Sequence, residues 1–268
     1  MTDLSEHTGI AQFGRACQYV LEHDTHAPGS VDRVLTERMV RLCAETADFL
    51  YGEFTPTRVP QFAACPPGLR TSHAAATRGC VTPEERVAGI ARFAAALQEK
   101  IQDPSLDAMT VGGTEEAIVA RGSDWCTDVA RVGCILCQVA GVPARLVFLV
   151  DTAVAYTGHV ICEAYREGVW GAVDASTAVV YRHANGKPAS TWELMASPAL
   201  IAAHAAPRAG YTTVGQFRAA AIANYFLADR ARYDYTPSGM NAYCRSILEM
   251  SMRGWPGGLR WLHGEERL

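Results

Sequence analysis

The feature that most constrains this chain is an apolar segment at residues 125–140, with hydrophobic side chains on most sides of the helix that it predicts. A helix without a polar face is stable only when other elements cover it. The Gly-Val-Pro sequence at 141–143 is typical of a helix C-terminus. Ser123 and Asp124, which precede the segment, are both good N-cap residues. The sequence therefore predicts a buried helix with Cys126 in its first turn.

Cys126 occupies a position that favours its reactive form. The first turn of a helix carries backbone N–H groups without intrahelical acceptors, and the helix dipole is positive there. Both features stabilise a thiolate, which is the nucleophilic form of cysteine. A cysteine taken alone is more often a buried structural residue, so this interpretation depends on partners elsewhere in the chain.

Strand-like segments after the helix supply candidate partners. They occupy residues 144–150, 159–165 and 169–173. The Arg-Glu-Gly sequence between the last two is a turn signal. A two-residue loop at Arg-Glu places His159 directly opposite Asp174, and one at Glu-Gly leaves them diagonal neighbours on one face. A three-residue loop without a bulge separates them, so two of the three registers bring the imidazole and the carboxylate together.

An ordered series of motifs surrounds these residues: Cys126 opening a helix, Gly-Val-Pro-Ala-Arg at 141–145, His159 with Glu163, and Trp170 with Val173 and Asp174. The series, from Thr114 to Val180, resembles the transglutaminase-like superfamily of papain-type thiol enzymes. The pattern of that family is a cysteine at a helix start, then G-[IV]-P-A-R, H-x-W-x-E and W-x-x-[VL]-D. The resemblance implies an α+β fold, with a nucleophile helix packed on a small antiparallel sheet and helical extensions at both ends.

The resemblance also implies roles for three residues. Cys126 would be the nucleophile, His159 its acid–base partner and Asp174 the orienting carboxylate. The chain departs from the family pattern at Ile161, where an aromatic residue is usual, and at Ala175, where proline is common. Neither departure removes a catalytic group, and both bear on the shape of the acyl pocket.

The implied function is cysteine-dependent acyl transfer through a thioester, forming or cleaving an amide bond in a small-molecule or peptidic substrate. The partners would be an acyl donor and, for transfer, an amine acceptor that is free or bound to a carrier protein. Release to water, as in a cysteine protease or amidase, uses the same triad, and the sequence leaves that choice open. A non-catalytic binding module with a papain-like fold is disfavoured, because degenerate copies typically lose the cysteine or the histidine.

Three further residues, Trp125, Tyr156 and Gly158, are candidates for substrate binding because they adjoin the predicted triad in sequence. Trp125 either shapes the oxyanion site beside the cysteine or packs in the core, and the two interpretations have equal weight. Arg145 and Glu163 lie on neighbouring predicted strands, where an ion pair between them is favoured over contact with substrate.

The eight other cysteines have no predicted helix start or histidine partner. Cys134 and Cys137 form a C-x-x-C pair inside the apolar helix with no second ligand pair, so core packing is favoured over redox or zinc chemistry. Cys162 alternates with His159 along its strand and is expected in the core. The alternative is a zinc site of Cys126 with Cys134, Cys137 and His159. We predict no metal and no cofactor.

Composition excludes several classes of function. The net charge is −4 and no basic run is present, so nucleic acid is not an expected partner. No apolar stretch approaches the roughly 20 residues of a membrane span, and none is expected. Residues 1–10 lack the basic and apolar regions of a secretory signal. Nine cysteines, an odd number scattered through the chain, fit a reducing compartment, so the expected location is cytoplasmic.

The chain is predicted to be a single domain, 1–268, made of a helical N-terminal part (1–108), a catalytic core (109–182) and a helical C-terminal extension (183–268). Helical spacing of apolar residues predicts helices at 10–20 and 31–49, and Thr-Pro-Glu-Glu at 82–85 is a strong helix start. Residues 54–79 are expected to form a long loop. Later helices are predicted for 213–226 and 241–253.

Overall fold

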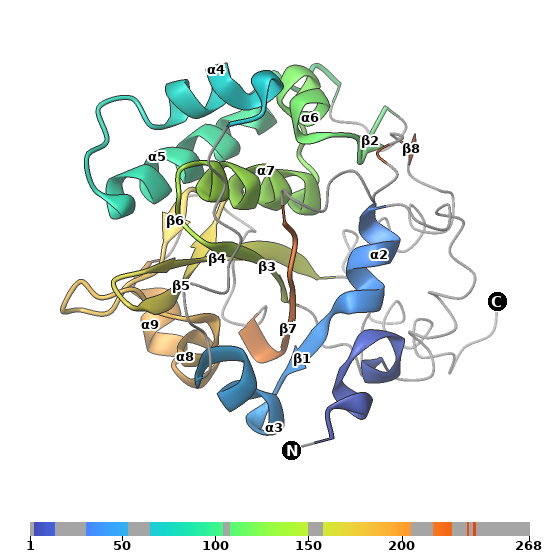
Figure 1. Cartoon of the computed structure of the whole chain (residues 1–268), viewed down its shortest axis with the longest axis vertical. Coiled ribbons are helices and arrows are strands. Elements are labelled where there is room, and N and C mark those ends of the chain that lie inside the picture. Colours follow the sequence, from blue (N-terminus) through green and yellow to red (C-terminus); the bar gives the residue numbers. More distant parts are fainter. Residues whose placement is uncertain are drawn as a thin grey trace.

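The structure is a computed structural model that describes residues 3–13, 31–52, 65–103, 108–149, 158–204, 217–226, 235 and 238–239. A six-stranded antiparallel sheet lies between two layers of helices (Figure 1), in the strand order β1-β7-β3-β4-β5-β6. Its strands are β1 (Val40–Leu42), β3 (Ala144–Leu149), β4 (His159–Arg166), β5 (Val169–Asp174), β6 (Val179–Val180) and β7 (Ala220–Ala223). A separate two-stranded sheet joins β2 (Thr110–Val111) to β8 (Ser238–Gly239).

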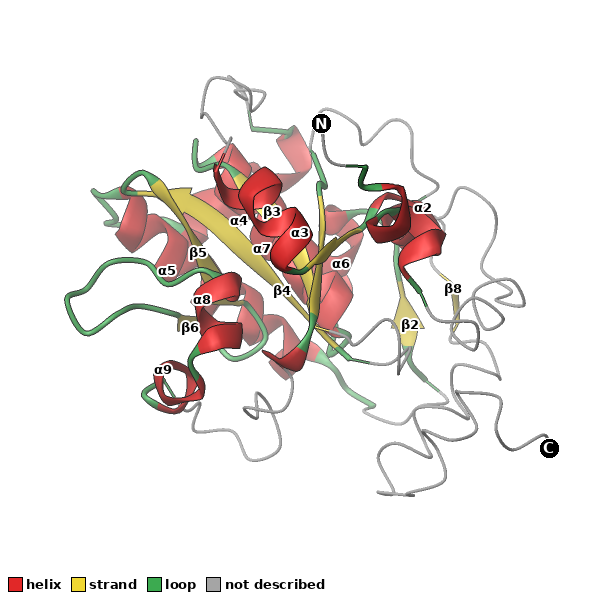
Figure 2. Ribbon diagram, turned by 90° about the horizontal axis from the view of Figure 1, so that it is seen from below, coloured by secondary structure: helices red, strands yellow, loops and turns green. Residues whose placement is uncertain are grey.

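Helices cover both faces of the main sheet (Figure 2). One layer contains α4 (Pro67–Ala76), α5 (Pro83–Ala95), α6 (Glu115–Arg121), α7 (Cys126–Val139) and the 3₁₀ turn η5 (Ala96–Lys100). The opposite layer contains α3 (Ala44–Ala47), the π-helical turn η3 (Asp48–Gly52), α8 (Thr191–Ala196) and α9 (Pro198–Ala202). Beside β1 lie α2 (Val31–Arg38) and the 3₁₀ turns η1 (Ser5–His7) and η2 (Gly9–Gln12). This is the predicted α+β fold, with helices outside the core of helix and sheet.

Helix α7 is the centre of its layer, as its apolar sequence predicts. Every residue from 127 to 138 is buried, and the helix contacts α5, α6, β3 and β4. It also approaches the sheet closely, because a Cβ added at Gly133 would lie 3.7 Å from the sulfur of Cys162 on β4 and 3.2 Å from the side chain of Ala175, which follows β5. The packing of α7 on β3 and β4 therefore fixes the position of its first residue, Cys126, relative to the sheet.

The β4–β5 hairpin adopts one of the registers that the sequence allows. Arg166 pairs with Val169, which makes Glu167 and Gly168 the loop residues. Their φ angles are 54° and 80°, and a two-residue loop with both φ angles positive is the turn that matches the twist of a hairpin. In this register His159 and Asp174 are diagonal neighbours on one face of the sheet.

Two predicted segments before the catalytic core differ in the structure. The predicted loop at 54–79 contains α4, which begins at Pro67 as the first residue of the helix. The helix predicted at 31–49 is interrupted after α2 by β1, because residues 40–42 pair with β7 at the edge of the sheet. Capping at 82–85 is as predicted, since Thr82 and Glu85 form a reciprocal capping box.

The predicted helix at 213–226 is wrong where the structure describes it. Residues 220–223 form β7, which lies between β1 and β3. All four side chains, Ala-Ala-Ile-Ala, are buried, and periodicity cannot separate a short buried strand from a helix. The main sheet therefore draws strands from all three predicted parts of the chain. The predicted helix at 241–253 lies outside the described residues.

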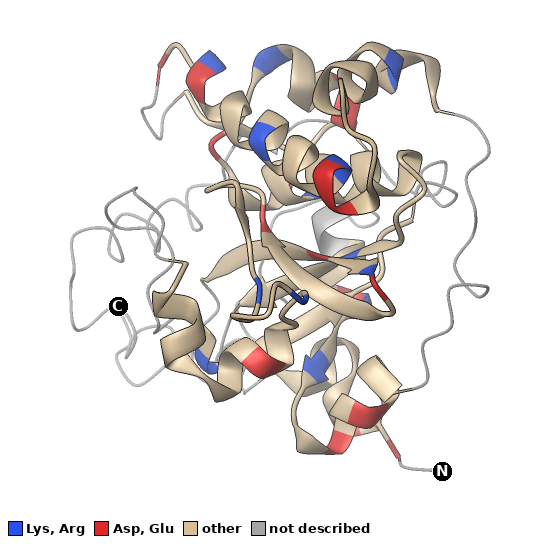
Figure 3. Cartoon of the chain, turned by 90° about the vertical axis from the view of Figure 1, so that its left-hand side faces the viewer, with Lys and Arg blue, Asp and Glu red and all other residues tan. Residues whose placement is uncertain are grey.

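The charged side chains show no strong segregation by sign. In Figure 3 acidic and basic positions are interspersed over the described helices. Among the described residues, no helix is long and apolar enough to cross a membrane.

Candidate active site

The three predicted catalytic residues lie together at one end of the sheet. Cys126 is the first residue of α7, His159 is the first residue of β4, and Asp174 is the last residue of β5. Because β3 follows α7 and runs antiparallel to β4, the start of β4 returns to the end of the sheet at which α7 begins. Three elements thus each contribute one terminal residue to the site.

His159 is held between the other two residues. Its Nε2 lies 3.1 Å from Oδ2 of Asp174, and its side chain is also hydrogen-bonded to that of Cys126. Since Nε2 faces the carboxylate, Nδ1 is the ring nitrogen left for the sulfur. The second carboxylate oxygen of Asp174 accepts the backbone N–H of Ser176 at 2.9 Å. Asp174 is therefore fixed at both oxygens and in turn fixes the imidazole ring.

Burial and charge act in opposite directions on His159. The ring is 3% exposed and Asp174 is fully buried. Burial lowers the pKa of the imidazole, but the hydrogen bonds and negative charges of Asp174 and Cys126 outweigh it and raise the pKa of His159 to about 10. The arrangement therefore favours an imidazolium at neutral pH, held between the carboxylate of Asp174 and the side chain of Cys126.

The start of α7 differs from the predicted one. Trp125, rather than Ser123 or Asp124, is the N-cap, and it makes no side-chain capping bond. Ser123 instead accepts the backbone N–H of Trp125 at 3.2 Å and donates to Asp128 at 3.1 Å. Because no side chain at the N-cap accepts the first N–H groups of α7, these groups can face a developing oxyanion beside Cys126.

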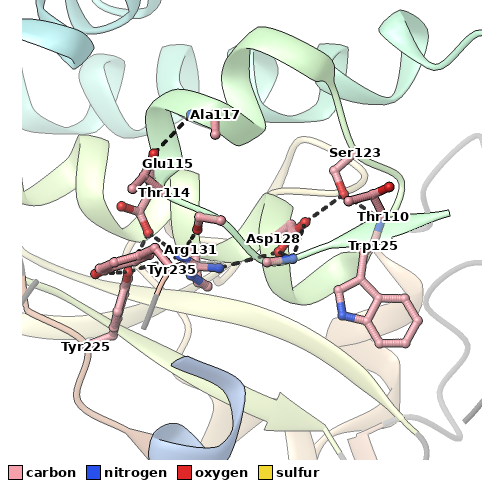
Figure 4. A network of polar contacts seen from close by, with 12 residues as sticks. Thr110, Thr114, Glu115, Ala117, Ser123, Trp125, Asp128, Arg131, Tyr225 and Tyr235 are labelled. Atoms are coloured by element: carbon pink, nitrogen blue, oxygen red, sulfur yellow. Dashed lines mark hydrogen bonds and ion pairs between the residues drawn. The ribbon is translucent and has the colours of Figure 1, made fainter. Parts of the chain in front are cut away.

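A buried polar network holds the first turns of α7 (Figure 4). Asp128 accepts hydrogen bonds from the backbone of Gly112, from Arg121 at 2.6 Å, from Ser123 and from Arg131 at 3.5 Å. Both Asp128 and Arg131 are fully buried. The charged pair thus ties α7 to the end of α6 and to the segment after β2.

The same network continues from Arg131 towards the C-terminal part of the chain. Arg131 donates to Glu115 at 2.8 Å and to the carbonyl of Gly113 at 2.7 Å. Tyr225, which follows β7, donates to Glu115 and lies 3.0 Å from the hydroxyl of Tyr235. Burial raises the pKa of the Tyr225 phenol well above its usual range, so the hydroxyl remains protonated and keeps its donor role. The sequence pointed to neither tyrosine; the available signal was a pair of charged residues inside an apolar helix.

We expect Asp128→Asn to lower the free energy of unfolding by about 3 kcal/mol, because breaking a buried ion pair leaves charged donors without their acceptor. An amide nitrogen in place of one carboxylate oxygen would also face other donors. Arg121→Gln is the matched control: its guanidinium is 26% exposed, so we expect a loss below about 1 kcal/mol. Denaturant unfolding of both variants measures this, and equal losses would contradict the role given to Asp128.

The predicted substrate-binding residues have different outcomes. Trp125 is half-buried at the N-cap of α7, directly before Cys126. Gly158 is exposed and directly precedes His159. Tyr156 lies outside the described residues. The first two therefore adjoin the site, and their contact with substrate stays a prediction.

The ion pair predicted between Arg145 and Glu163 is confirmed. The two residues are paired on β3 and β4, and Arg145 Nη2 lies 2.7 Å from Glu163 Oε2. Glu163 also accepts from Tyr51 at 2.8 Å and from the backbone of Thr191 at 2.8 Å. The guanidinium lies 4.1 Å from the centre of the Trp170 ring. Both charged groups are thus used to join the sheet to the layer of α3 and α8.

The cysteines predicted to be structural lie in the core. Cys134, Cys137 and Cys162 are at most 1% exposed, and burial raises the pKa of each thiol, to about 12 for Cys137. Among the described residues, the one group of three side chains with metal-binding proximity includes neither Cys126 nor His159. The geometry therefore gives the alternative zinc site no support.

A cavity of about 680 Å³ lies beside the segment that leads to Cys126. Its lining comes from residues 100–103, 108–110 and 120–124. It includes the basic residues Lys100 and Arg121 and the acidic residues Asp103 and Asp124. Asp124, one of the lining residues, lies two positions before Cys126 in the sequence, so part of a substrate bound in this cavity would lie beside the segment that leads to the nucleophile.

The fold and the site define a class: an α+β protein in which a thiol at the start of a buried helix meets an imidazole and a carboxylate from a β-hairpin. Residues 72–175 match the sequence model of the transglutaminase-like superfamily and form a domain of that superfamily. No curated protein and no solved structure matches the chain. A domain of this superfamily indicates cysteine-dependent chemistry on amide bonds.

Proposed function

We propose that this protein is a cysteine acyltransferase that forms or cleaves an amide bond through a thioester on Cys126. The observation that carries the proposal is the placement of the buried His159 between the sulfur of Cys126 and the carboxylate of Asp174. A triad in this order activates a nucleophile and orients its acid–base partner. The superfamily domain at residues 72–175 supports the same chemistry.

In the first half-reaction the thiolate of Cys126 attacks the carbonyl carbon of the donor, and a C–S bond forms as the carbonyl oxygen becomes an oxyanion. Backbone N–H groups at the start of α7 stabilise that oxyanion. His159 then gives its proton to the leaving amine, the C–N bond breaks, and a thioester remains on Cys126. Asp174 keeps Nε2 of the ring occupied throughout, so that Nδ1 faces the reacting atoms.

In the second half-reaction an amine or a water molecule attacks the thioester. His159 accepts the proton of the attacking group, the C–S bond breaks, and the thiolate is restored. Transfer to an amine needs a pocket that limits water at the thioester, whereas hydrolysis needs water access. Hydrolysis, as in an amidase, is therefore the alternative outcome of the same chemistry.

The cavity of about 680 Å³ supports a polar donor. Side chains of both charges line it, among them Asp124 and Arg121. Such a lining suits amide, ammonium or carboxylate groups better than a long hydrocarbon chain, because apolar ligands leave buried polar groups without partners. We therefore propose a small polar or peptidic acyl donor.

Intact-mass analysis tests the proposal. The protein is incubated with a glutamine-containing peptide, a small amino-acid amide and a fatty acyl thioester. We expect an added acyl mass with a polar donor, located on Cys126 and released by hydroxylamine as a hydroxamate. Adding a primary amine and measuring the amide product against the free acid then separates transfer from hydrolysis. Acylation of a different cysteine, or no adduct with any donor, would overturn the proposal.

A further inference from the structure

A second cysteine–histidine cluster lies outside the candidate active site, where η1 meets the start of α3. Cys43 follows β1 and is the N-cap of α3, and its sulfur lies 3.8 Å from Nδ1 of His7 on η1. Glu45, in the first turn of α3, completes the group. The expectation that no other cysteine has a helix start or a histidine partner is therefore wrong for Cys43, because the contact joins residues 36 positions apart.

The geometry of this cluster differs from that of a triad. At the candidate active site the imidazole of His159 separates the thiol from the carboxylate, which is the order that acid–base catalysis needs. In the second cluster one donor atom from each of His7, Cys43 and Glu45 lies within 4.8 Å of the other two. Convergence of the three atoms on one point instead suits a cation.

The donor set identifies the class of cation. A thiolate, an imidazole and a carboxylate are the ligand types of zinc, which binds them in a tetrahedron. Zinc–ligand bonds of the usual length imply a sulfur-to-nitrogen edge of about 3.5 Å, close to the 3.8 Å between Cys43 and His7. Glu45 is exposed, so its side chain can rotate to close the remaining distance.

Backbone contacts join the two segments that carry the cluster. Thr8 pairs with Val40, and the N–H of Gly9 donates to the carbonyl of Met39 at 2.8 Å. The N–H of Cys43 donates to Thr46 Oγ1 at 3.0 Å. The ligands therefore come from two segments that are already joined, which lowers the entropy cost of binding.

We propose that His7, Cys43 and Glu45 bind one zinc ion, with the fourth position open to water, and that the ion fastens the N-terminal segment to the β1–α3 corner. Binding converts the Cys43 thiol to a thiolate and releases its proton to solvent, so affinity falls at low pH. The charge of Arg41 acts on Glu45 and opposes a cation there, whereas the thiolate and the carboxylate together neutralise the ion.

Zinc titration of the full chain against a chromophoric chelator tests this site. The background is Cys126→Ala, which removes zinc binding at the active-site thiol. We expect one zinc equivalent, lost in Cys43→Ser and weakened at least about 100-fold in His7→Ala, since even outer-shell changes cost 10- to 100-fold in affinity. Serine is a good N-cap, so Cys43→Ser keeps the start of α3. Cys80→Ser, which changes another half-buried thiol, is the matched control and should retain the equivalent.

Cobalt substitution provides a second readout. Co²⁺ should give a thiolate-to-metal charge-transfer band that disappears in Cys43→Ser and persists in Cys80→Ser. If Cys43→Ser loses the zinc equivalent but keeps the cobalt charge-transfer band, the thiolate ligand is a different cysteine and the proposed site is wrong. Absence of zinc binding, or binding equal in Cys43→Ser and Cys80→Ser, would also overturn it. None of these outcomes depends on acyl chemistry, so failure here leaves the proposed function unaffected.

Discussion

Replacing Cys126 with alanine should lower turnover on the order of 10⁶-fold, the scale seen when a hydrolase loses the nucleophile of its triad. Among the described cysteines, Cys126 is the one that starts α7 with its side chain on His159, so no other described thiol can replace it. The fold should remain, because Cys126 is half-buried at a helix end and makes no capping bond on which α7 depends. The measurements are turnover with the donor found by mass analysis and denaturant unfolding of the variant.

Cys134→Ala is the matched control for this substitution. Cys134 lies two helical turns further along α7 and is fully buried. We expect this variant to retain turnover and to lose about 1 kcal/mol of stability, as for removal of one buried group of similar size. Substantial turnover in Cys126→Ala, or its loss in Cys134→Ala, would show that the nucleophile is assigned to the wrong residue.

Asp174→Asn should lower turnover by roughly 10- to 10³-fold while leaving the shape of the site unchanged. The equivalent change in a serine protease costs about 10⁴, and we expect less here because a thiol ionises more readily than a hydroxyl and is helped by the helix dipole. Asparagine removes the charge that, together with Cys126, raises the pKa of His159 to about 10. Burial of the ring, which lowers that pKa, would then have less opposition, and the amide can also stabilise the wrong tautomer.

The pH dependence of iodoacetamide labelling measures this effect directly. In Asp174→Asn the imidazolium should be lost at lower pH, so rapid labelling of Cys126 should require a higher pH than in the wild type. The buried thiols Cys134, Cys137 and Cys162 serve as internal controls, because they should label only on unfolding. Circular dichroism checks the fold. Coincident labelling profiles with unchanged activity would make Asp174 a turn residue only.

The free energy of unfolding should also depend on pH through His159. The pKa of His159 is raised in the folded protein above its ordinary value near 6.5. The stabilisation from its ion pair is therefore complete below about pH 6.5 and is lost as pH rises towards 10. Asp174→Asn should flatten this part of the curve of unfolding free energy against pH.

Much of the candidate site could be predicted from the sequence because its determinants are local. The apolar run that forms α7 and the Gly-Val-Pro that ends it are neighbours in the chain. The two-residue loop at Glu167 and Gly168 sets the strand register and puts His159 on the same face as Asp174. The period of side chains along a helix or strand predicted the buried helix and left three hairpin registers, two of which place His159 and Asp174 on one face, and the structure adopts one of those two.

The tertiary structure alone decided the parts that join distant segments. Residues 220–223 became a strand because β1 and β3 cover them on both sides, which their short apolar pattern could not indicate. Trp125 became the N-cap because Ser123 is used by Asp128, and Cys43 gained His7 from a segment 36 residues away. The periodicity within one element shows which of its faces is buried. The contacts named here depend on which distant segment packs against that face, and periodicity carries no information about that.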